Sequence, residues 1–230
     1  MHVNHDMTSI SLILPTRDDV GYLLEIVSEV QRHSTPVEII IVDSASHLTN
    51  SREIQKVRSS FDHNPPIVIN SSIGLGAALQ AGYSQASGEI IGWFPTDNQM
   101  SVQVLKSLLT NCRPTKFVYA ARMGYRESNT RLRSWLSQID KVIVRRLMSM
   151  IDSEFSGVYL CPRTLIDNLP FEYSTAAINW SLADLAVKAG LTIEGIEAII
   201  QPRLNGRSRI SLREMVHYPT ELLRYAFIFR

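Results

Sequence analysis

The sequence predicts an α/β fold in which helices flank a mostly parallel, doubly wound sheet. Short apolar runs rich in β-branched residues alternate with segments of helical periodicity, which indicates the order β-α-β-α-β-α-β. Each run is apolar at successive positions, as is typical of parallel strands that helices cover on both faces. The expected strands are residues 10–14, 37–42, 67–69, 90–94 and 117–120.

The composition fits a globular protein with one large domain or two small ones. Of the 230 residues, 45% are hydrophobic and 20% are charged, which excludes a disordered chain. The formal net charge of +1 does not indicate a nucleic-acid partner. The two cysteines, Cys112 and Cys161, exclude a disulfide scaffold and favour a reducing compartment. We expect neither a membrane span nor a secretory signal, because no run of about 18 apolar residues occurs and residues 1–9 have no apolar core.

Helical patterns separate the expected strands. Between the first two strands, apolar and aromatic side chains recur at helical spacing, at Tyr22, Leu23, Ile26, Val27 and Val30. Asp18 or Asp19 precedes this stripe and is the expected N-cap. Residues 76–87 have a similar spacing and predict a helix between the third and fourth strands.

Acidic and hydroxyl side chains follow three of the expected strands. The sequences are PTRD at 15–18, DSAS at 43–46 and PTDNQ at 95–99. In doubly wound sheets, ligands bind outside the carboxyl ends of the strands. Carboxylates at these ends can accept hydrogen bonds from a base or ribose, or hold a divalent cation. Asp97 taken alone could equally cap a helix that begins near Ser101.

Two common nucleotide-binding motifs are missing. The turn after the first strand has no glycine, whereas a dinucleotide-binding GxGxxG should stand there. Gly74 and Gly76 follow the third strand and lack the later glycine spacing. No GxxxxGK[ST] segment occurs, so the sequence also disfavours a P-loop nucleotidase.

Six blocks along the chain carry the residues of one known family. They are SLILPT at 11–16, EIIIVD at 38–43, GLGAA at 74–78 followed by Gly82, Ala86 and Gly88-Glu89, FPTDNQ at 94–99, FSGVYL at 155–160 and RLNGRSR at 203–209. In this order they resemble the family 2 glycosyltransferases of the GT-A fold. Among these, the chain is most similar to polyprenyl-phosphate sugar transferases of the dolichol-phosphate mannosyltransferase type. The resemblance implies transfer of a sugar, with inversion, from a UDP- or GDP-linked nucleotide sugar to a polyprenyl phosphate.

The resemblance also implies a role for each residue of the site. The donor would be bound by Pro15, Thr16, Asp18, Asp43, Gly76, Thr96 and Arg122. Asp97 and Gln99 would hold a divalent cation, Mg²⁺ or Mn²⁺, and the catalytic residues would be Asp97, Arg203 and Arg209. The acceptor would be bound by Arg131, Arg133 and Ser156. The arginines suit phosphate because guanidinium makes bidentate, charge-assisted bonds. For Gly76, tight backbone packing is the competing interpretation.

The expected acceptor depends on a missing pair of acids. Relatives that glycosylate a hydroxyl need a general base, for which the resemblance would supply a Glu-Asp pair before a helix in the second half. Residues 179–184 read NWSLAD, which leaves Asp184 as a fallback base. A phosphate is already ionised near neutral pH, so the sequence favours a lipid phosphate over a saccharide hydroxyl. Transfer to a saccharide hydroxyl in cell-surface glycan synthesis stays open. So does a catalytically weak nucleotide-sugar-binding protein, because Pro95 replaces the first acid of the family's DxD and removes a charged oxygen ligand.

Two amphipathic segments predict contact with a membrane surface. Residues 122–146 hold seven arginines and lysines among apolar side chains, and residues 211–230 combine leucines and aromatics with three arginines. Such segments can lie on an anionic bilayer, although the first is also compatible with a solvated helix face. We expect one catalytic domain at 1–210, with a nucleotide-sugar half at about 8–100 and an acceptor half at 101–210, and an amphipathic tail at 211–230. The expected location is cytoplasmic, with peripheral attachment to the cytoplasmic face of a membrane.

Overall fold

A computed structural model describes residues 8–17, 20–44, 48–61, 64–123, 154–201 and 212–229. Within these residues, seven strands form one sheet in the order β3-β2-β1-β4-β6-β5-β7. The strands are β1 (Ile10–Thr16), β2 (Val37–Asp43), β3 (Ile67–Asn70), β4 (Ile90–Trp93), β5 (Lys116–Met123), β6 (Phe155–Pro162) and β7 (Thr192–Ile199). All neighbouring strands are parallel except β6, which is antiparallel to both β4 and β5. The predicted α/β fold with a mostly parallel sheet is confirmed.

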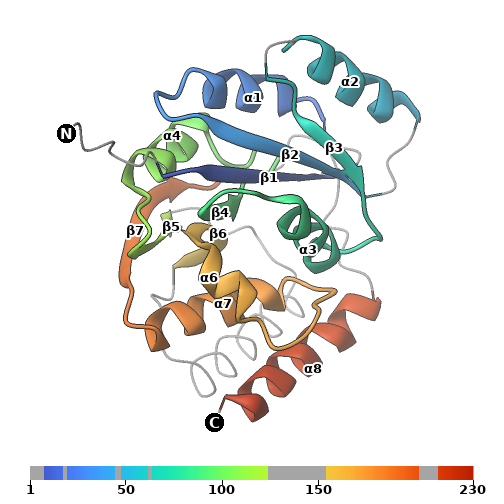
Figure 1. The fold of residues 1–230 in the computed structure, drawn as a ribbon. Helices are drawn as coiled ribbons and strands as arrows, with labels where there is room; N and C mark the ends of the chain where they lie inside the picture. Colours follow the sequence, from blue (N-terminus) through green and yellow to red (C-terminus); the bar gives the residue numbers. More distant parts are fainter. Residues whose placement is uncertain are drawn as a thin grey trace, which may run out of the picture.

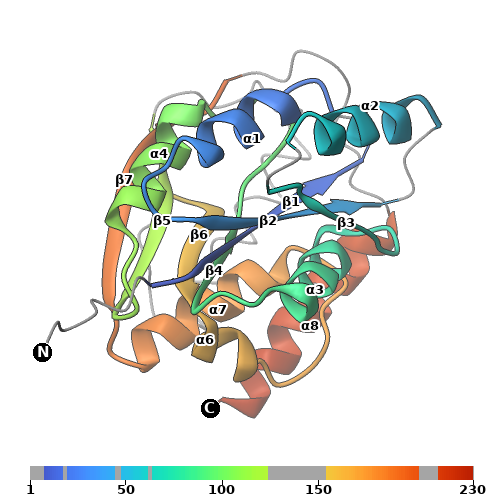
Figure 2. The same cartoon turned by 45° about the horizontal axis from the view of Figure 1, so that its top comes forward.

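Helices cover both faces of this sheet. One face carries α1 (Leu23–Gln31), α2 (Leu48–Ser59) and α4 (Val102–Asn111), and the other carries α3 (Leu75–Gln85), α6 (Arg163–Asp167), α7 (Ala177–Lys188) and α8 (Leu212–Ile228), as Figure 1 and Figure 2 show. The hydrophobic core lies between the sheet and the helices on each of its faces. It is built from the central strands, in which Leu12, Ile13 and Leu14 of β1 are wholly buried.

The five predicted strands are all present; the structure lengthens β1, β2, β3 and β5 and ends β4 at Trp93, one residue before the predicted end. Pairing between β1 and β2 continues past their apolar runs to the pair Thr16 and Asp43, so both polar residues belong to the strands themselves. The strands β6 and β7 were not among the predicted runs. In β7 buried and exposed positions are mixed, because it is the edge strand beside β5.

The predicted N-cap of the first helix is wrong. α1 begins at Leu23 with Tyr22 at the N-cap position, so Asp18 and Asp19 precede the helix by too many residues to cap it. Tyr22 makes no side-chain capping bond there, and its hydroxyl instead accepts from the backbone N–H of Val102 at 3.1 Å. The contact joins the starts of α1 and α4, both of which follow the carboxyl edge of the sheet.

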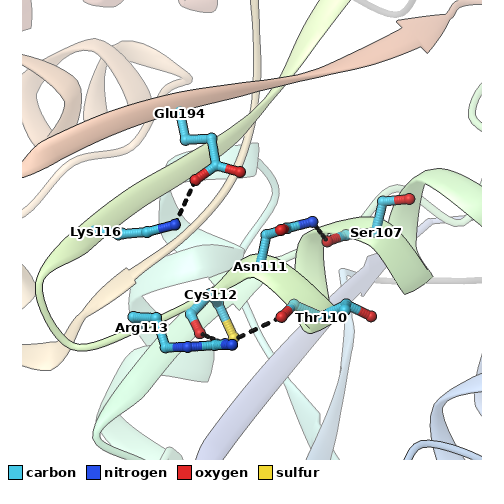
Figure 3. A network of polar contacts seen from close by, with 7 residues as sticks. All are labelled: Ser107, Thr110, Asn111, Cys112, Arg113, Lys116 and Glu194. Carbon is cyan, nitrogen blue, oxygen red and sulfur yellow. Dashed lines mark hydrogen bonds and ion pairs between the residues drawn. The ribbon is translucent and has the colours of Figure 1, made fainter.

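The end of α4 and the start of β5 are held by polar contacts, drawn in Figure 3. The guanidinium of Arg113 donates to the carbonyl oxygens of Thr110 and Cys112 at 3.0 and 2.6 Å, which satisfies acceptors that the helix end leaves open. Lys116 and Glu194 form an ion pair of 2.6 Å between β5 and the edge strand β7. The ion pair holds β7 near its first residues, far from its carboxyl end.

Candidate functional site

The carboxyl ends of β1, β2 and β4 come together at one edge of the sheet. Thr16 and Asp43 are directly paired in register, and the backbone N–H of Ser44 donates to the Thr16 carbonyl at 3.0 Å. The Thr96 hydroxyl donates to the Pro15 carbonyl at 3.2 Å, which joins the turn after β4 to the end of β1. Thr16, Asp43 and Thr96 are all buried. The structure therefore assembles four predicted donor-binding residues, Pro15, Thr16, Asp43 and Thr96, from three separate segments.

Asp97 lies in a tight turn after β4. The Asp97 carboxylate accepts the backbone N–H of Gln99 at 3.3 Å, and Asn98 between them has a φ of 58°, in the left-handed region that asparagine tolerates. The N-cap of α4 is Ser101, whose hydroxyl accepts the N–H of Gln103 at 3.1 Å. Asp97 is therefore not the helix cap, and that interpretation of it is excluded.

The same turn is tied to the residues that follow β7. The Gln201 N–H donates to the Gln99 carbonyl at 2.9 Å, and the Gln99 side-chain amide donates to the Gln201 carbonyl at 3.3 Å. This reciprocal pair holds the chain just before residue 202 against the Asp97 turn. Arg203 and Arg209 come later in the same segment, outside the described residues.

The turn carries oxygen donors of the kind that a divalent cation binds. Its donors are the Asp97 carboxylate and the Gln99 amide oxygen, both hard oxygen ligands, and Gln99 directs its amide nitrogen to Gln201. In the described part of the chain no cluster of three or more acids, histidines or cysteines could hold a metal unaided. Mg²⁺ is commonly held by one or two carboxylates together with substrate phosphates and water. The donor set therefore fits a cation that is shared with a diphosphate.

A cavity of about 280 Å³ opens beside Asp43. It is lined by Asp43, Ile54, Gln55, Arg58, Val68 and Asn70, from β2, α2 and β3. Sequence reasoning found Asp43 but missed the other polar members of this wall, Gln55, Arg58 and Asn70. Asn70 ends β3 directly opposite Asp43, so examining the end of the third strand as well would have found it.

Gly76 packs against protein backbone. A Cβ at Gly76 would lie 2.3 Å from the Thr175 carbonyl oxygen, and one at Gly74 would lie 2.4 Å from that of Ser174. Gly74 also has a φ of 132°, which side chains rarely adopt. Both glycines thus permit residues 174–175 to cross the start of α3. The predicted donor contact of Gly76 stays a prediction beside this packing role.

Arg122 and Ser156 lie on neighbouring strands. Arg122, near the end of β5, is exposed, and its backbone N–H donates to the Glu154 carbonyl at 2.6 Å. The Ser156 hydroxyl accepts the N–H of Val158 at 3.3 Å. The other predicted site residues, Asp18, Arg131, Arg133, Arg203 and Arg209, lie outside the described residues.

Asp184 does not serve as a base for an acceptor. Its side chain is wholly buried in α7, accepts the Tyr225 hydroxyl at 2.7 Å and pairs with Lys188 at 2.9 Å. The fallback interpretation of Asp184 is therefore wrong, because a buried, paired carboxylate is closed to a substrate hydroxyl.

The C-terminal helix α8 has two different faces. Leu222, Tyr225 and Ala226 are buried on the body of the protein, whereas Val216, Leu223 and Phe227 are 66%, 54% and 87% exposed. The exposed three recur at spacings that place them along one side of the helix. Among the described helices, none combines the length and the apolar character needed to cross a membrane.

Comparison with known proteins gives one family match and one curated relative. The family described as "Glycosyl transferase family 2" matches residues 11–178. An undecaprenyl-phosphate 4-deoxy-4-formamido-L-arabinose transferase from Pseudomonas fluorescens (strain Pf0-1) is 23% identical over 167 residues, 69% of this chain and 48% of that protein. The chain thus spans about half the length of this curated relative.

Solved structures with the same fold come from Mycobacterium tuberculosis. Glucosyl-3-phosphoglycerate synthase with uridine diphosphate matches with a TM-score of 0.71 at 18% identity, over 96% of this chain and 80% of that one. The same enzyme with Mn²⁺, UDP-glucose and phosphoglyceric acid matches with a TM-score of 0.68 at 17% identity, over the same shares. The match confirms the GT-A fold.

Proposed function

Because this chain belongs to glycosyl transferase family 2, we propose that it transfers a sugar, with inversion, from a UDP- or GDP-linked donor to a polyprenyl phosphate. The observation that carries the proposal is the meeting of Thr16, Asp43 and the Asp97 turn at the carboxyl ends of three strands. In open α/β sheets this edge is where ligands bind.

The nucleotide end of the donor would lie beside Asp43. The cavity of about 280 Å³ at Asp43 is close to the lower end of small-molecule sites, which suits a nucleobase better than a whole nucleotide. The Asp43 carboxylate can accept from a base N–H or a ribose hydroxyl, and Asn70 opposite can donate and accept.

The diphosphate would lie over the Asp97 turn. Asp97 and Gln99 would hold a Mg²⁺ or Mn²⁺ ion, which supplies positive charge for the departing diphosphate. Gln201 holds the start of the segment that contains Arg203 and Arg209 against this turn. Those two guanidinium groups are proposed to bind phosphate oxygens and to stabilise the charge that develops there.

A lipid phosphate is the proposed acceptor. One of its oxygens attacks the anomeric carbon while the bond from that carbon to the diphosphate breaks on the opposite side, which inverts the configuration. The attacking oxygen is already ionised, so the step needs no general base. Within α7, the one acid is Asp184, which is buried in an ion pair. The similarity to an undecaprenyl-phosphate 4-deoxy-4-formamido-L-arabinose transferase supports the same acceptor class.

The exposed side of α8 is proposed to rest on the membrane that holds this lipid. Val216, Leu223 and Phe227 would enter the interface while the opposite side of the helix stays docked on the protein. Flotation with vesicles of phosphatidylglycerol and phosphatidylcholine tests this. Leu223→Ser together with Phe227→Ser should abolish co-flotation, whereas Leu24→Ser, at a half-exposed position of α1, should not. Equal flotation of both variants and the wild type would remove α8 from the proposal.

Transfer assays separate the proposal from its two alternatives. UDP- and GDP-sugars would be incubated with undecaprenyl phosphate or with oligosaccharides, in Mn²⁺ or EDTA. Product on the lipid phosphate alone supports the proposal. Product on oligosaccharides alone would show that the acceptor is a saccharide hydroxyl instead. Nucleotide binding without turnover on any donor would indicate the weak nucleotide-sugar-binding protein that Pro95 suggests. A thermal-shift panel of the same donors identifies the sugar nucleotide first, because a ligand that binds the folded state raises Tm.

A further inference from the structure

We infer that Glu221 of α8 is a positioning residue for the donor site, which it reaches through Ser174 and Thr175. The inference rests on the proposed function for its catalytic meaning. Glu221 lies on the C-terminal helix, outside the residues 11–178 that match the family, and its carboxylate bonds Ser174 and Thr175, which are not among the proposed substrate-binding residues.

The Glu221 carboxylate accepts four hydrogen bonds from two consecutive residues. One oxygen accepts from the N–H and hydroxyl of Ser174 at 2.8 and 2.7 Å. The other oxygen accepts from the N–H and hydroxyl of Thr175 at 3.2 and 2.5 Å. The Thr175 hydroxyl in turn accepts the N–H of Ala177, the first residue of α7. A single side chain of α8 therefore sets the path of the backbone just before α7.

Residues 174–175 press directly on the start of α3. The carbonyl oxygens of Ser174 and Thr175 lie so close to Gly74 and Gly76 that a Cβ on either glycine would clash. Near Glu221, α3 and α8 are separated by a cavity of about 670 Å³ that both helices line. Residues 174–175 therefore connect Glu221 of α8 to the start of α3 beside this cavity.

The turn before α3 leads back to the donor-binding edge. Ser71 follows β3 and donates its N–H to the Asp43 carbonyl at 3.1 Å, and its hydroxyl bonds that of Ser44 at 2.9 Å. The chain from Ser71 to Gly74 is thus held by Asp43 and Ser44 at one end and by residues 174–175 at the other. Movement of residues 174–175 would shift the wall of the proposed base pocket.

A carboxylate is required at position 221 because both of its oxygens accept. In Glu221→Gln, one oxygen is replaced by an NH₂ group that only donates, so it faces a backbone N–H that then lacks an acceptor. The substitution keeps the size of the side chain and the packing of α8. It therefore loosens residues 174–175 without removing the helix.

The matched control is Tyr225→Phe on the same helix. It removes the buried hydrogen bond to Asp184 but leaves the Glu221 bonds intact. Ser174→Ala is a second test variant that weakens the same contact from the other side, and it serves if Glu221→Gln does not fold. All variants are made in the full chain.

Two measurements then separate the positioning role from the proposed function. Hydrogen exchange of peptides that cover residues 70–78 should be faster in Glu221→Gln and Ser174→Ala than in the wild type and Tyr225→Phe. Titration with UDP and with GDP in Mn²⁺ should give a Kd about tenfold weaker in Glu221→Gln, the effect of roughly one lost charged hydrogen bond. With the cognate donor, KM should rise more than kcat falls.

Each outcome decides one of the two claims. Unchanged exchange at residues 70–78 in both test variants, or equal losses of affinity in Glu221→Gln and Tyr225→Phe, would overturn the positioning role. If the wild type binds neither nucleotide while Glu221→Gln still loosens residues 70–78, the proposed function fails and the structural connection stands.

Discussion

Asp97→Asn separates the charge of the candidate cation site from its geometry. The asparagine oxygen can still accept the Gln99 N–H, whose bond of 3.3 Å contributes no more than about 1 kcal/mol. Ser101 caps α4 independently, so the helix keeps its N-terminus. We expect a change in Tm of less than about 4 °C, the shift that 1 kcal/mol causes in a domain of this size.

Turnover, in contrast, should fall by about 10²–10³-fold, because the substitution removes a charged oxygen from the stabilisation of the departing diphosphate. The assay follows nucleotide diphosphate release from the cognate donor over a Mn²⁺ titration, with circular dichroism on the same samples. Asp167→Asn, at an exposed acid of α6, makes the same change in net charge far from the turn and should leave turnover unchanged. An Asp97→Asn protein with wild-type turnover and wild-type Mn²⁺ dependence would refute the assignment.

Three further predictions concern the scaffold. Gly92→Ala would place a Cβ 2.0 Å from the Tyr159 carbonyl oxygen and should lower the free energy of unfolding by about 3 kcal/mol in urea titrations. In the control Gly21→Ala, the added Cβ has no atom within 4 Å, so the free energy of unfolding should not change. Tyr83→Phe leaves the buried Tyr159 hydroxyl without its 2.5 Å partner and should cost about 1–3 kcal/mol, most of which the double Phe variant should recover. Burial raises the pKa of the Cys112 thiol from 9.0 to about 11. Between these pH values the unfolded chain loses a proton that the folded chain keeps. The free energy of unfolding should therefore be unaffected by this thiol below pH 9 and should fall as the pH rises towards 11. A urea midpoint that stays constant from pH 8.5 to 10.5 would contradict this last expectation.

The sequence could predict that the candidate donor-binding residues meet at one edge of the sheet, because each lies at the end of an apolar strand. Thr16, Asp43 and Thr96 are each next to a run that is recognisable by composition, and the parallel order of β1, β2 and β4 brings their ends together. The position of Asp97 needed the structure. A lone acid after a strand can cap a helix or face a ligand, and the observed Ser101 cap excludes the first of these for Asp97.

The tail was predicted to be amphipathic, but its contact with residues 174–175 was not predicted. Periodicity reports that a helix has an apolar side, and it does not report what that side packs against. The structure shows that Tyr225 and Leu222 are buried while Leu223 and Phe227 remain exposed. It also shows the Glu221 carboxylate at the backbone of residues 174–175, a contact between positions 46 and 47 residues apart. No local pattern encodes such a contact.

The sequence by itself determined the class of fold, the strands that carry the candidate site and the family resemblance. These depend on local composition and on the order of motifs, and both can be read from short segments of the sequence. The tertiary structure decided which polar residues have a structural partner and which lie together at the carboxyl edge of the sheet. It buried Asp184 in an ion pair, excluded Asp97 as a helix cap, and placed Gly76 against Thr175. The physical reason is that burial and hydrogen-bond partners arise from segments distant in the chain, so the same carboxylate can be a ligand, a cap or a core acceptor until those segments are in place.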